Sequence, residues 1–246
     1  MRYELYYWPS IQGRGEFVRL ALEEGGVDYL DVARTDDGQA RMLALLEGEL
    51  VHPPFAPPFL RAGKRLIGQT ANILLFIGKR HGLAPKGRTA RLWTHQLQLT
   101  LADLVGEAHD AHHPLGPGLY YDDQRSEAKR RAADFTKTRI PKYLQYFERV
   151  LASNASGPSW LVGAKLSYAD LSLYQVVAGL HYAFPNAMKA TASRFPHVMA
   201  LHAQVAARPR IAAYLVSERR LPFNDQGIFR HYRALDPAPR KTRPPS

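Results

Sequence analysis

Alternating and helical patterns of hydrophobic residues divide the chain into two unlike parts. In the first 82 residues, short alternating runs predict strands at 3–8, 29–32, 59–61 and 65–67. Helical spacing predicts helices at 15–25, at about 38–47 and from Thr70 to a stop at Gly82. The predicted order is βαβαββα, and the first two strands should run parallel because a helix connects them.

Strand patterns are lost after Gly82, and long helical patterns replace them. These patterns run from about 89 to 112 and from about 124 to 152. Ser167 and Asp170 have the spacing of a capping box that starts a further helix, and two prolines, Pro196 and Pro209, mark later helix starts. The sequence therefore predicts an α/β domain over residues 1–82, an all-helical domain over 88–225 and a tail over 226–246.

Composition places the chain among globular proteins with an apolar core. Of its 246 residues, 46% are hydrophobic, which is an ordinary share. The sequence has no run of about 18 apolar residues that could span a membrane, and its first strand starts without a secretory hydrophobic region. It has no cysteine, which excludes disulfides, thiolate metal sites and a cysteine nucleophile from this chain. We expect a cytoplasmic protein.

The net charge of +11 raises the question of a nucleic-acid partner, but much of this charge is local. After Gly227 the tail has five Arg or Lys residues and one Asp, so four of the eleven charges lie in a Pro-rich end. The sequence has no basic patch interleaved with aromatic residues elsewhere. We therefore expect a mobile basic tail, and neither a nucleic acid nor a membrane as a partner.

The predicted hairpin leads directly into a candidate anion site. Gln69 and Thr70 follow the fourth strand, and Thr70 has the position of an N-cap for the next helix. The free N–H groups and the positive dipole end at a helix start both favour a carboxylate. Taken alone, this stretch also fits an ordinary hairpin followed by a capped helix.

Five stretches of the chain, in the right order, resemble the glutathione transferases of the tyrosine-type classes. They are Tyr3–Pro9, Gln12–Glu16, Pro58–Thr70, Leu161–Asp170 and Ala207–Ile211. The resemblance covers about residues 3–226 and points to a tyrosine-type-like member, bacterial or unclassified. It implies a thioredoxin-like N-terminal domain joined to an all-helical C-terminal domain.

In this family a hydroxyl donates a hydrogen bond to the sulfur of glutathione, and Tyr7 matches the tyrosine with that role. A thiol with a pKa near about 8.5 is mostly protonated at neutral pH, so a donor that favours the thiolate raises the reactive fraction. The loop from Tyr7 to Arg14 is one residue longer than in the compared classes, which leaves Ser10 open as the donor. The third alternative is that Tyr7 has only a structural role in the strand and does not contact the sulfur.

The resemblance also implies contacts to the γ-glutamyl end of glutathione. Gln69 and Thr70 match the pair that holds the γ-glutamyl carboxylate. Asp103 matches an acidic residue that reaches the γ-glutamyl amine across a homodimer, although a solvated helix carboxylate is the alternative. Arg14 matches a basic residue at the wall of the site, and structural pairing is its alternative role.

A proline-rich turn before the hairpin is implied to hold the cysteinyl part of glutathione, through Ala56, Pro57 and Pro58. Pro58 has the family's spacing for a cis-proline. The residue before it is Pro57, which has no N–H to pair with the ligand. The two alternatives are the loss of one hydrogen bond or a cis bond between Ala56 and Pro57.

Histidines cluster at the end of the first long helix. His109 and His113 are four residues apart, as in some zinc sites, but the Glu that a zinc protease needs between them is absent, so we expect no metal. His113 instead matches a residue that lines the hydrophobic-substrate pocket, near Tyr120. A surface histidine is the alternative.

The resemblance implies a homodimeric detoxification enzyme that uses glutathione as co-substrate. Its thiolate would attack a soft, hydrophobic electrophile, and reduction of hydroperoxides would follow the same chemistry. The alternative is a non-catalytic binding protein that carries a hydrophobic ligand in the same cleft. A donor hydroxyl at the sulfur distinguishes the two functions, since only the enzyme needs it.

Overall fold

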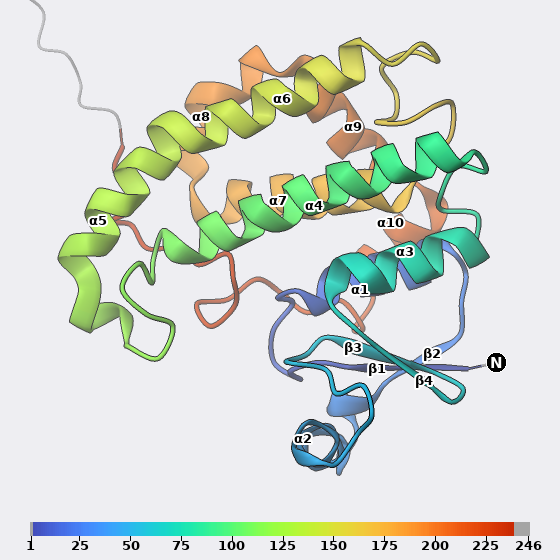
Figure 1. Ribbon diagram of the computed structural model, residues 1–246. Helices are drawn as coiled ribbons and strands as arrows, with labels where there is room; N and C mark the ends of the chain where they lie inside the picture. The colour runs from blue at the N-terminus through green and yellow to red at the C-terminus, as the bar shows by residue number, and fades with distance from the viewer. Residues whose placement is uncertain (1, 239–246) are drawn as a thin grey trace, which may run out of the picture.

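The first part of the chain forms a four-stranded sheet, as the sequence predicts (Figure 1). The computed structural model describes residues 2–238. Its strands are β1 (Tyr3–Tyr6), β2 (Tyr29–Asp31), β3 (Phe59–Ala62) and β4 (Arg65–Gly68). They lie in the order β2-β1-β3-β4, with β1 parallel to β2 and antiparallel to β3. The predicted parallel pairing of the first two strands is confirmed.

Helices cover both faces of this sheet (Figure 1). On one face lie α1 (Gly15–Glu24) and α3 (Thr70–Arg80), and on the other lies α2 (Gly38–Glu47), which follows the short turn η1 (Val32–Arg34). Strand alternation divides the apolar side chains between the two faces. Leu5 belongs to the main core, whereas Tyr6 packs in a smaller cluster with Met42 of α2. This is the expected thioredoxin-like arrangement.

After α3 the described chain contains helices and turns but no further strand. The elements are α4 (Arg88–Asp110), η2 (Tyr121–Gln124), α5 (Arg125–Asp134), η3 (Phe135–Arg139), α6 (Ile140–Ala152), α7 (Tyr168–Ala183), α8 (Pro185–Thr191), η4 (Ala192–Arg194), α9 (Pro196–Ala206) and α10 (Pro209–Leu215). The π-type turn η3 joins α5 to α6 without a break, so the long helix predicted at 124–152 is nearly continuous. Among the described residues, no helix is long and apolar enough to cross a membrane.

The central helix α7 starts at the predicted capping box. The carboxylate of Asp170 accepts hydrogen bonds from the Ser167 N–H and from the Leu161 N–H, each at 2.7 Å. Asp170 is fully buried, and burial raises its pKa to about 6. The carboxylate therefore ties the loop before α7 to the first turn of the helix.

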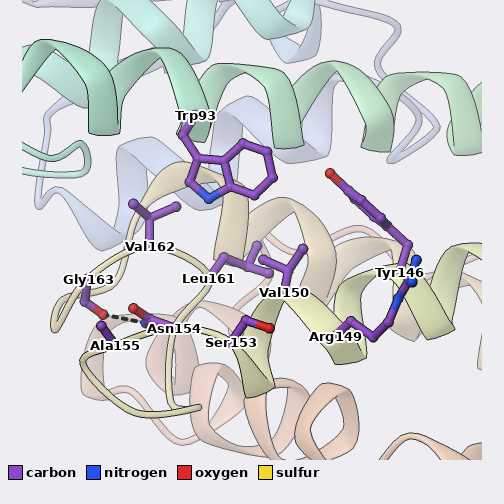
Figure 2. A pocket seen from close by; sticks show the side chains of 10 residues that line it. All are labelled: Trp93, Tyr146, Arg149, Val150, Ser153, Asn154, Ala155, Leu161, Val162 and Gly163. Atoms are coloured by element: carbon purple, nitrogen blue, oxygen red, sulfur yellow. Dashed lines mark hydrogen bonds between the residues drawn. The ribbon is translucent and has the colours of Figure 1, made fainter.

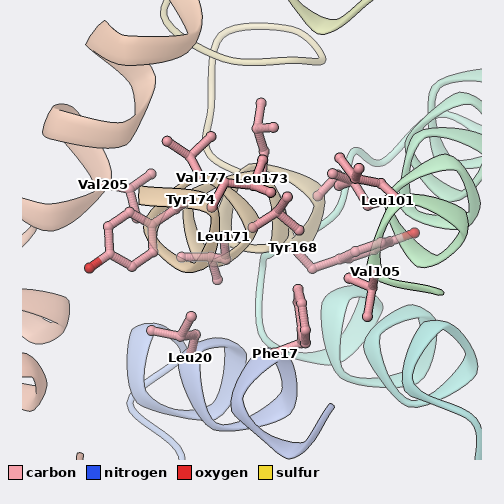
Figure 3. Close-up of a cluster of buried hydrophobic side chains, with 14 of the residues drawn as sticks. Phe17, Leu20, Leu101, Val105, Tyr168, Leu171, Leu173, Tyr174, Val177 and Val205 are labelled. Carbon is pink, nitrogen blue, oxygen red and sulfur yellow. The ribbon is translucent and has the colours of Figure 1, made fainter. Parts of the chain in front are cut away.

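The core of the molecule runs without interruption from the sheet helices into the helical part. Phe17 and Leu20 of α1 face Leu171 and Tyr174 of α7, and Leu101 of α4 closes the other side (Figure 3). Most of α7 is buried on all sides, which explains why its sequence has almost no polar stripe. A shared core of this kind holds the two parts in one fixed arrangement.

The prediction of a mobile tail is wrong for residues 226–238. Ile228, Phe229 and Leu235 are buried, and Phe229 packs so closely on Gly179 that a Cβ there would lie 2.3 Å from its ring. The carboxylate of Asp236 accepts hydrogen bonds from the N–H groups of Asn186 and Ala187 at the start of α8, at 2.7 and 3.0 Å. The rest of the predicted tail, residues 239–246, lies outside the described residues.

Candidate active site at the end of the first strand

The pairing of three strands brings the predicted glutathione-binding segments side by side. Tyr6 of β1 pairs with Phe59 of β3, which in turn pairs with Gly68 of β4. The next residues beyond this row are Tyr7, Pro58 and Gln69. The sheet register therefore collects residues that are up to about 60 positions apart at one edge, next to the start of α1 and α3.

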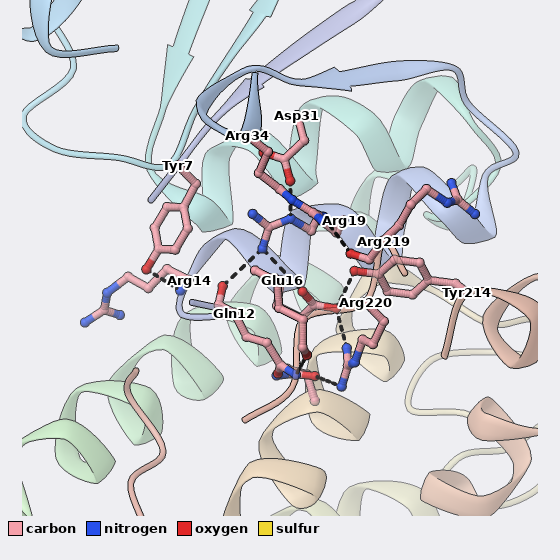
Figure 4. Close-up of polar contacts among 12 residues, drawn as sticks. Tyr7, Gln12, Arg14, Glu16, Arg19, Asp31, Arg34, Tyr214, Arg219 and Arg220 are labelled. Carbon is pink, nitrogen blue, oxygen red and sulfur yellow. Dashed lines mark hydrogen bonds and ion pairs between the residues drawn. The ribbon is translucent and has the colours of Figure 1, made fainter. Parts of the chain in front are cut away.

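Tyr6 and Tyr7 leave β1 on opposite faces, as strand alternation predicts. The Tyr6 ring stacks on Phe59 with ring centroids 4.8 Å apart, in the cluster under α2. The Tyr7 ring lies over the start of α1, where the Tyr7 hydroxyl accepts a hydrogen bond from the Arg14 N–H at 2.8 Å (Figure 4). Because this bond uses a lone pair of the oxygen, the hydroxyl proton of Tyr7 stays available for another acceptor.

The surroundings of Tyr7 keep its hydroxyl protonated. The residue is 5% exposed, and burial raises its pKa above the ordinary value. The Arg14 N–H and the charges of Arg14 and Arg19 act in the opposite direction but are outweighed. At neutral pH, Tyr7 is thus a neutral phenol that can donate a hydrogen bond.

Two glycines form the cradle of the Tyr7 ring. A Cβ at Gly13 would lie 2.0 Å from the Tyr7 hydroxyl oxygen, and a Cβ at Gly15 would lie 2.6 Å from the ring. Gly13 also has a φ of +45°, which side chains other than glycine rarely adopt. Both glycines lie in the stretch Gln12–Glu16 that resembles the family. Their role as a steric cradle for Tyr7 becomes clear only in three dimensions.

Gln69 and Thr70 sit at the start of α3 with unused hydrogen-bonding groups. Gln69 is the N-cap, with an unusual φ of +68°, and Thr70 is the first helical residue, so the helix starts one residue earlier than a Thr70 N-cap predicts. The first N–H to reach a helix carbonyl is that of Ile73, which bonds to Gln69 O. The Thr70 hydroxyl is buried and has no hydrogen-bond partner among the described residues.

The proline turn adjoins this helix start. The peptide bond between Pro57 and Pro58 is cis, so Pro58 is the cis-proline that its spacing indicates. Pro58 is buried directly before β3, Pro57 is half-buried and Ala56 is exposed. The carbonyl of Pro57 remains available as an acceptor, although its nitrogen cannot donate.

Arg14 lies between the two parts of the molecule, whereas Asp103 lies outside. Arg14 and Thr70 line a small cavity of about 20 Å³ with Gln98 of α4, which is 2% exposed and whose Oε1 has no partner among the described residues. Asp103 is exposed on the outer face of α4 and lines a surface groove with Tyr143 of α6. Within one chain, Asp103 and Thr70 therefore line different hollows.

The other candidate sulfur donor, Ser10, lies on the exposed turn after β1. Its carbonyl accepts a hydrogen bond from the Asn224 side chain at 2.9 Å. The C-terminal segment thus contacts the loop that carries Ser10. In contrast to Tyr7, Ser10 is exposed, and no hydrogen bond orients its hydroxyl within the described residues.

A histidine cluster closes the end of α4. His112 donates a hydrogen bond from Nε2 to the Ile228 carbonyl at 2.8 Å, and its Nδ1 pairs with Nδ1 of His113. Burial, more than any charge, lowers the pKa of His112 to about 3 and that of His113 to about 4. Both rings are neutral near pH 7. The predicted pocket residue His113 is thus buried, but Tyr120 is 81% exposed and gains no support as a pocket residue.

The described residues do not group three or more metal-ligating side chains in a way that could hold an ion. His109 Nδ1 lies 3.6 Å from the Asp110 carboxylate, and its ring lies edge-on to His112 and tilted against His113. One nitrogen of His112 and one of His113 are used in the bond between the rings. The cluster is therefore an internal polar contact of the helix end.

A separate polar network joins α1 to the C-terminal segment (Figure 4). Glu16 is fully buried and accepts hydrogen bonds from Tyr214 at 2.8 Å, from Arg220 and from Arg19. Arg19 also pairs with Asp31 at 2.8 Å. Burial alone would lower the pKa of Arg19, but Asp31 and Glu16 outweigh it and raise that pKa. Sequence patterns missed this network because Tyr214 and Arg220 lie about 200 residues after Glu16.

Comparison with known proteins is consistent with this geometry. The family described as "Glutathione S-transferase, C-terminal domain" matches residues 109–218. The chain is 28% identical to glutathione S-transferase P 1 of Xenopus laevis over 224 residues, which cover 89% of this chain and 93% of the relative. It is 29% identical to glutathione S-transferase A4 of Bos taurus, over 85% of this chain and 86% of the relative.

A solved structure shares the fold over nearly the whole length. The Pi-class glutathione S-transferase of Onchocerca volvulus aligns with a TM-score of 0.71, at 22% identity, over 92% of this chain and 99% of its own. These relatives are eukaryotic, and the expected bacterial or unclassified subgroup is not confirmed by them. The comparisons support the thioredoxin-like fold followed by a helical domain.

Proposed function

We propose that this chain, a member of the glutathione S-transferase family, conjugates the thiolate of glutathione to a soft electrophile. The observation that carries the proposal is the Tyr7 hydroxyl, which accepts the Arg14 N–H and keeps its own proton to donate. Tyr7 follows β1 at the sheet edge where Pro58 and the start of α3 also lie. The protein acts by positioning glutathione and by stabilising its thiolate.

Tyr7 donates its hydrogen bond to the glutathione sulfur. A hydrogen bond that favours the anion lowers the pKa of the bound thiol, so a larger share of glutathione is nucleophilic at neutral pH. Burial supports this role because it keeps Tyr7 from ionising itself. Ser10 is the alternative donor, and its exposure on a turn makes it the weaker candidate.

The start of α3 binds the γ-glutamyl carboxylate. Three free N–H groups, the helix dipole and the unpartnered Thr70 hydroxyl together offer donors to a negative charge. Gln69 presents its backbone and amide from the bend before the helix. The cysteinyl part lies along Ala56, Pro57 and Pro58, where the Pro57 carbonyl accepts a hydrogen bond from the ligand.

The working unit is a cytoplasmic homodimer in which Asp103 of one subunit reaches the γ-glutamyl ammonium of the other. Its support is the exposure of Asp103 on the outer face of α4, where it lines a different hollow from Thr70 of its own chain. Arg14 lines the wall between Tyr7 and α4. A molar mass of one chain in light scattering at micromolar concentration would contradict the dimer.

The electrophile binds beside Tyr7, toward the end of α4, where His113 supplies a neutral polar wall. Substrates range from aromatic halides to organic hydroperoxides, which the same thiolate attacks at oxygen. We place the chain in the tyrosine-type classes because Tyr7 matches their donor tyrosine. This placement fits the names of its relatives, glutathione S-transferase P 1 and A4. Its biological role is detoxification.

A conjugation assay tests this function directly. The purified chain is incubated with glutathione and 1-chloro-2,4-dinitrobenzene, and the conjugate is measured by absorbance and by mass spectrometry. We expect turnover well above the uncatalysed rate, and a fall of about tenfold or more for Tyr7→Phe. Absence of turnover together with tight binding of glutathione would favour a carrier without catalysis.

A further inference from the structure

A buried glutamine, Gln12, lies on the loop that joins β1 to α1, beside the Glu16 network (Figure 4). The same loop carries Arg14, whose N–H donates to the Tyr7 hydroxyl at 2.8 Å. Gln12 is only 5% exposed, although glutamine is mostly exposed in folded proteins. A buried amide needs hydrogen-bond partners, and the partners of Gln12 come from three parts of the chain.

Hydrogen bonds hold both the side chain and the backbone of Gln12. Its Oε1 accepts from the Gln175 amide of α7 at 2.7 Å, and its Nε2 donates to the Leu221 carbonyl in the C-terminal segment. Its own carbonyl accepts from the Glu16 N–H at 3.0 Å and from the Arg19 guanidinium at 3.4 Å. Gln12 is therefore tied to α1, to α7 and to the C-terminal segment at once.

The immediate neighbours of Arg14 do not provide such a restraint. Arg14 lies between Gly13 and Gly15, and glycine has the least restricted backbone of all residues. Larger residues do not fit there, because a Cβ at either position would collide with the Tyr7 side chain. The place of the Arg14 N–H therefore depends on the residue before Gly13, which is Gln12.

The Arg14 N–H affects the Tyr7 hydroxyl in two ways. It occupies a lone pair of the oxygen, so the hydroxyl proton points toward another acceptor. Burial raises the pKa of Tyr7, and this N–H opposes that effect, which makes the phenol a stronger donor. A displaced Arg14 N–H would leave the tyrosine ring in place and weaken the hydrogen bond that its hydroxyl donates.

Another side-chain amide, Asn154, fixes a loop that has no such neighbour. It donates to the Gly163 carbonyl at 2.8 Å (Figure 2), and to the Trp160 carbonyl at the same distance. This loop borders a cavity of about 510 Å³, and none of the residues that we place around glutathione lines that cavity. Asn154 is therefore a suitable structural control for Gln12.

We propose that Gln12 is a positioning residue for the transferase reaction, which holds its loop so that the Arg14 N–H meets the Tyr7 hydroxyl. Gln12 acts through Arg14 and Tyr7 and does not contact the sulfur itself. The inference rests on the proposed role of Tyr7 as the donor to the glutathione sulfur. It means that α7 and the C-terminal segment support the reactivity of the thiol from outside the glutathione site.

Gln12→Met tests the inference, because methionine has a similar length and lacks the amide. The pKa of the thiol in the glutathione complex should rise by about half a unit, less than in Tyr7→Phe, because the donor is loosened and not deleted. Turnover of 1-chloro-2,4-dinitrobenzene should fall about threefold at a pH below that pKa. It should match the parent chain at a pH where the bound thiol is ionised in both proteins.

The control variant Asn154→Leu also removes an amide that fixes a loop, and it should leave the pKa of the bound thiol unchanged. A fall in turnover by the same factor at every pH in Gln12→Met would show a purely structural role and overturn the inference. An equal shift of the thiol pKa in Asn154→Leu would overturn it as well.

Exchange of the Arg14 amide proton with solvent, followed by NMR, gives a readout that needs no glutathione. Exchange should be faster in Gln12→Met than in the parent chain and unchanged in Asn154→Leu, because only the first variant loosens the loop before α1. An Arg14 amide that exchanges equally in the parent chain and in Gln12→Met would contradict the assigned role of Gln12.

Gln175→Met removes one of the same hydrogen bonds from the side of α7 and tests the inference even if Gln12→Met does not fold. It should shift the thiol pKa in the same direction, and the double variant should add little. No shift in the folded glutamine variants, together with a shift in Tyr7→Phe, would overturn the role of Gln12 and leave the transferase function intact. If Tyr7→Phe itself leaves the thiol pKa in place, the proposed function fails and this inference fails with it.

Discussion

Two polar regions of this molecule adjoin α1, and they differ in how many of their hydrogen bonds are made within the chain. Around Glu16, carboxylates meet arginines, Tyr214 and Gln12 in a buried network that links α1 to the C-terminal segment. At the sheet edge, the Tyr7 proton, the first N–H groups of α3 and the Thr70 hydroxyl have no partner within the described chain. The Glu16 network is held by many bonds within the chain, although Arg19 Nη2 and Asp31 Oδ1 are buried without a partner among the described residues. Its dense internal pairing indicates a structural role, whereas the free donors at the sheet edge support the proposed ligand site.

The contrast teaches that charge density alone does not locate an active site. The Glu16 network contains more ionisable groups than the sheet edge, and the pKa values of its Arg19 and Tyr214 are raised. Its bonds are internal, and its role is to fix the C-terminal segment over α1. The candidate catalytic site is the region with fewer ionisable groups, where the Tyr7 phenol and the start of α3 keep free hydrogen-bond donors.

Breaking the Glu16 network should have the largest effect on stability. Arg19→Leu leaves the Asp31 carboxylate without its cation and leaves Glu16 with Arg220 as its remaining cation. We therefore expect a loss of about 3–5 kcal/mol in the free energy of unfolding, measured by urea titration. The control is Arg219→Leu, which breaks an exposed pair with Glu23 and should cost less than about 1 kcal/mol. Equal losses in the two variants would mean that the buried network is no more structural than a surface pair.

Thr70→Val should weaken glutathione binding and leave stability almost unchanged. It removes a hydroxyl that we assign to the γ-glutamyl carboxylate, and a hydrogen bond to a charged group contributes about 1.5–3 kcal/mol. Calorimetry should therefore show affinity lower by about tenfold or more. Thr100→Val, whose hydroxyl bonds only to Gln96 of its own helix, is the control. If Thr70→Val destabilises the fold but binds glutathione normally, the hydroxyl is a structural group.

Acid should destabilise the protein through its buried neutral histidines. The pKa of His112 falls from an ordinary 6.5 to about 3, mainly through burial. Between these values the unfolded chain binds more protons than the folded chain, so stability rises with pH and is lost as pH falls. From about pH 7 to about pH 5 this residue alone should account for a loss of about 2 kcal/mol.

His112→Gln keeps a donor for the Ile228 carbonyl but cannot titrate, so its urea midpoint should change less between the two pH values. The exposed His52→Gln should keep the acid loss of the parent chain. An unchanged acid loss in His112→Gln would show that other groups dominate this pH window.

The C-terminal segment gives the smallest expected effect. Asp236→Ala removes an acceptor at the start of α8 and should lower the free energy of unfolding by about 1 kcal/mol, as for a lost helix cap. Asp225→Ala, at an exposed position of the same segment, is the control for the charge change. If the melting temperatures of these two variants agree, residue 236 does not anchor the segment.

Sequence patterns predicted the parts of the fold that depend on neighbouring residues. The hairpin, the helix after Gln69 and the capping box at Ser167 follow from local turn chemistry and periodicity, and the structure agrees closely. The docking of Phe229 could not be predicted this way. Its apolar neighbours have no period, and its partner Gly179 lies 50 positions earlier on a helix that is buried all round.

The candidate site was predictable only as a set of motifs. Tyr7, Pro58 and Gln69 could be named from spacing, yet their meeting at one edge depends on strand register. The glycine cradle and the free proton of Tyr7 depend on the position of the Arg14 N–H, which a sequence cannot give. Tyr120 is the opposite case. Its position in the sequence predicted a residue of the substrate pocket, but its side chain is exposed.

The titration of bound glutathione tests the central claim most directly. The thiolate absorbance of the complex is followed against pH for the parent chain, for Tyr7→Phe and for Ser10→Ala. We expect the pKa of the bound thiol to rise by about one to two units in Tyr7→Phe and to stay in place in Ser10→Ala. A shift in Ser10→Ala with none in Tyr7→Phe would assign the sulfur to the serine and contradict the account.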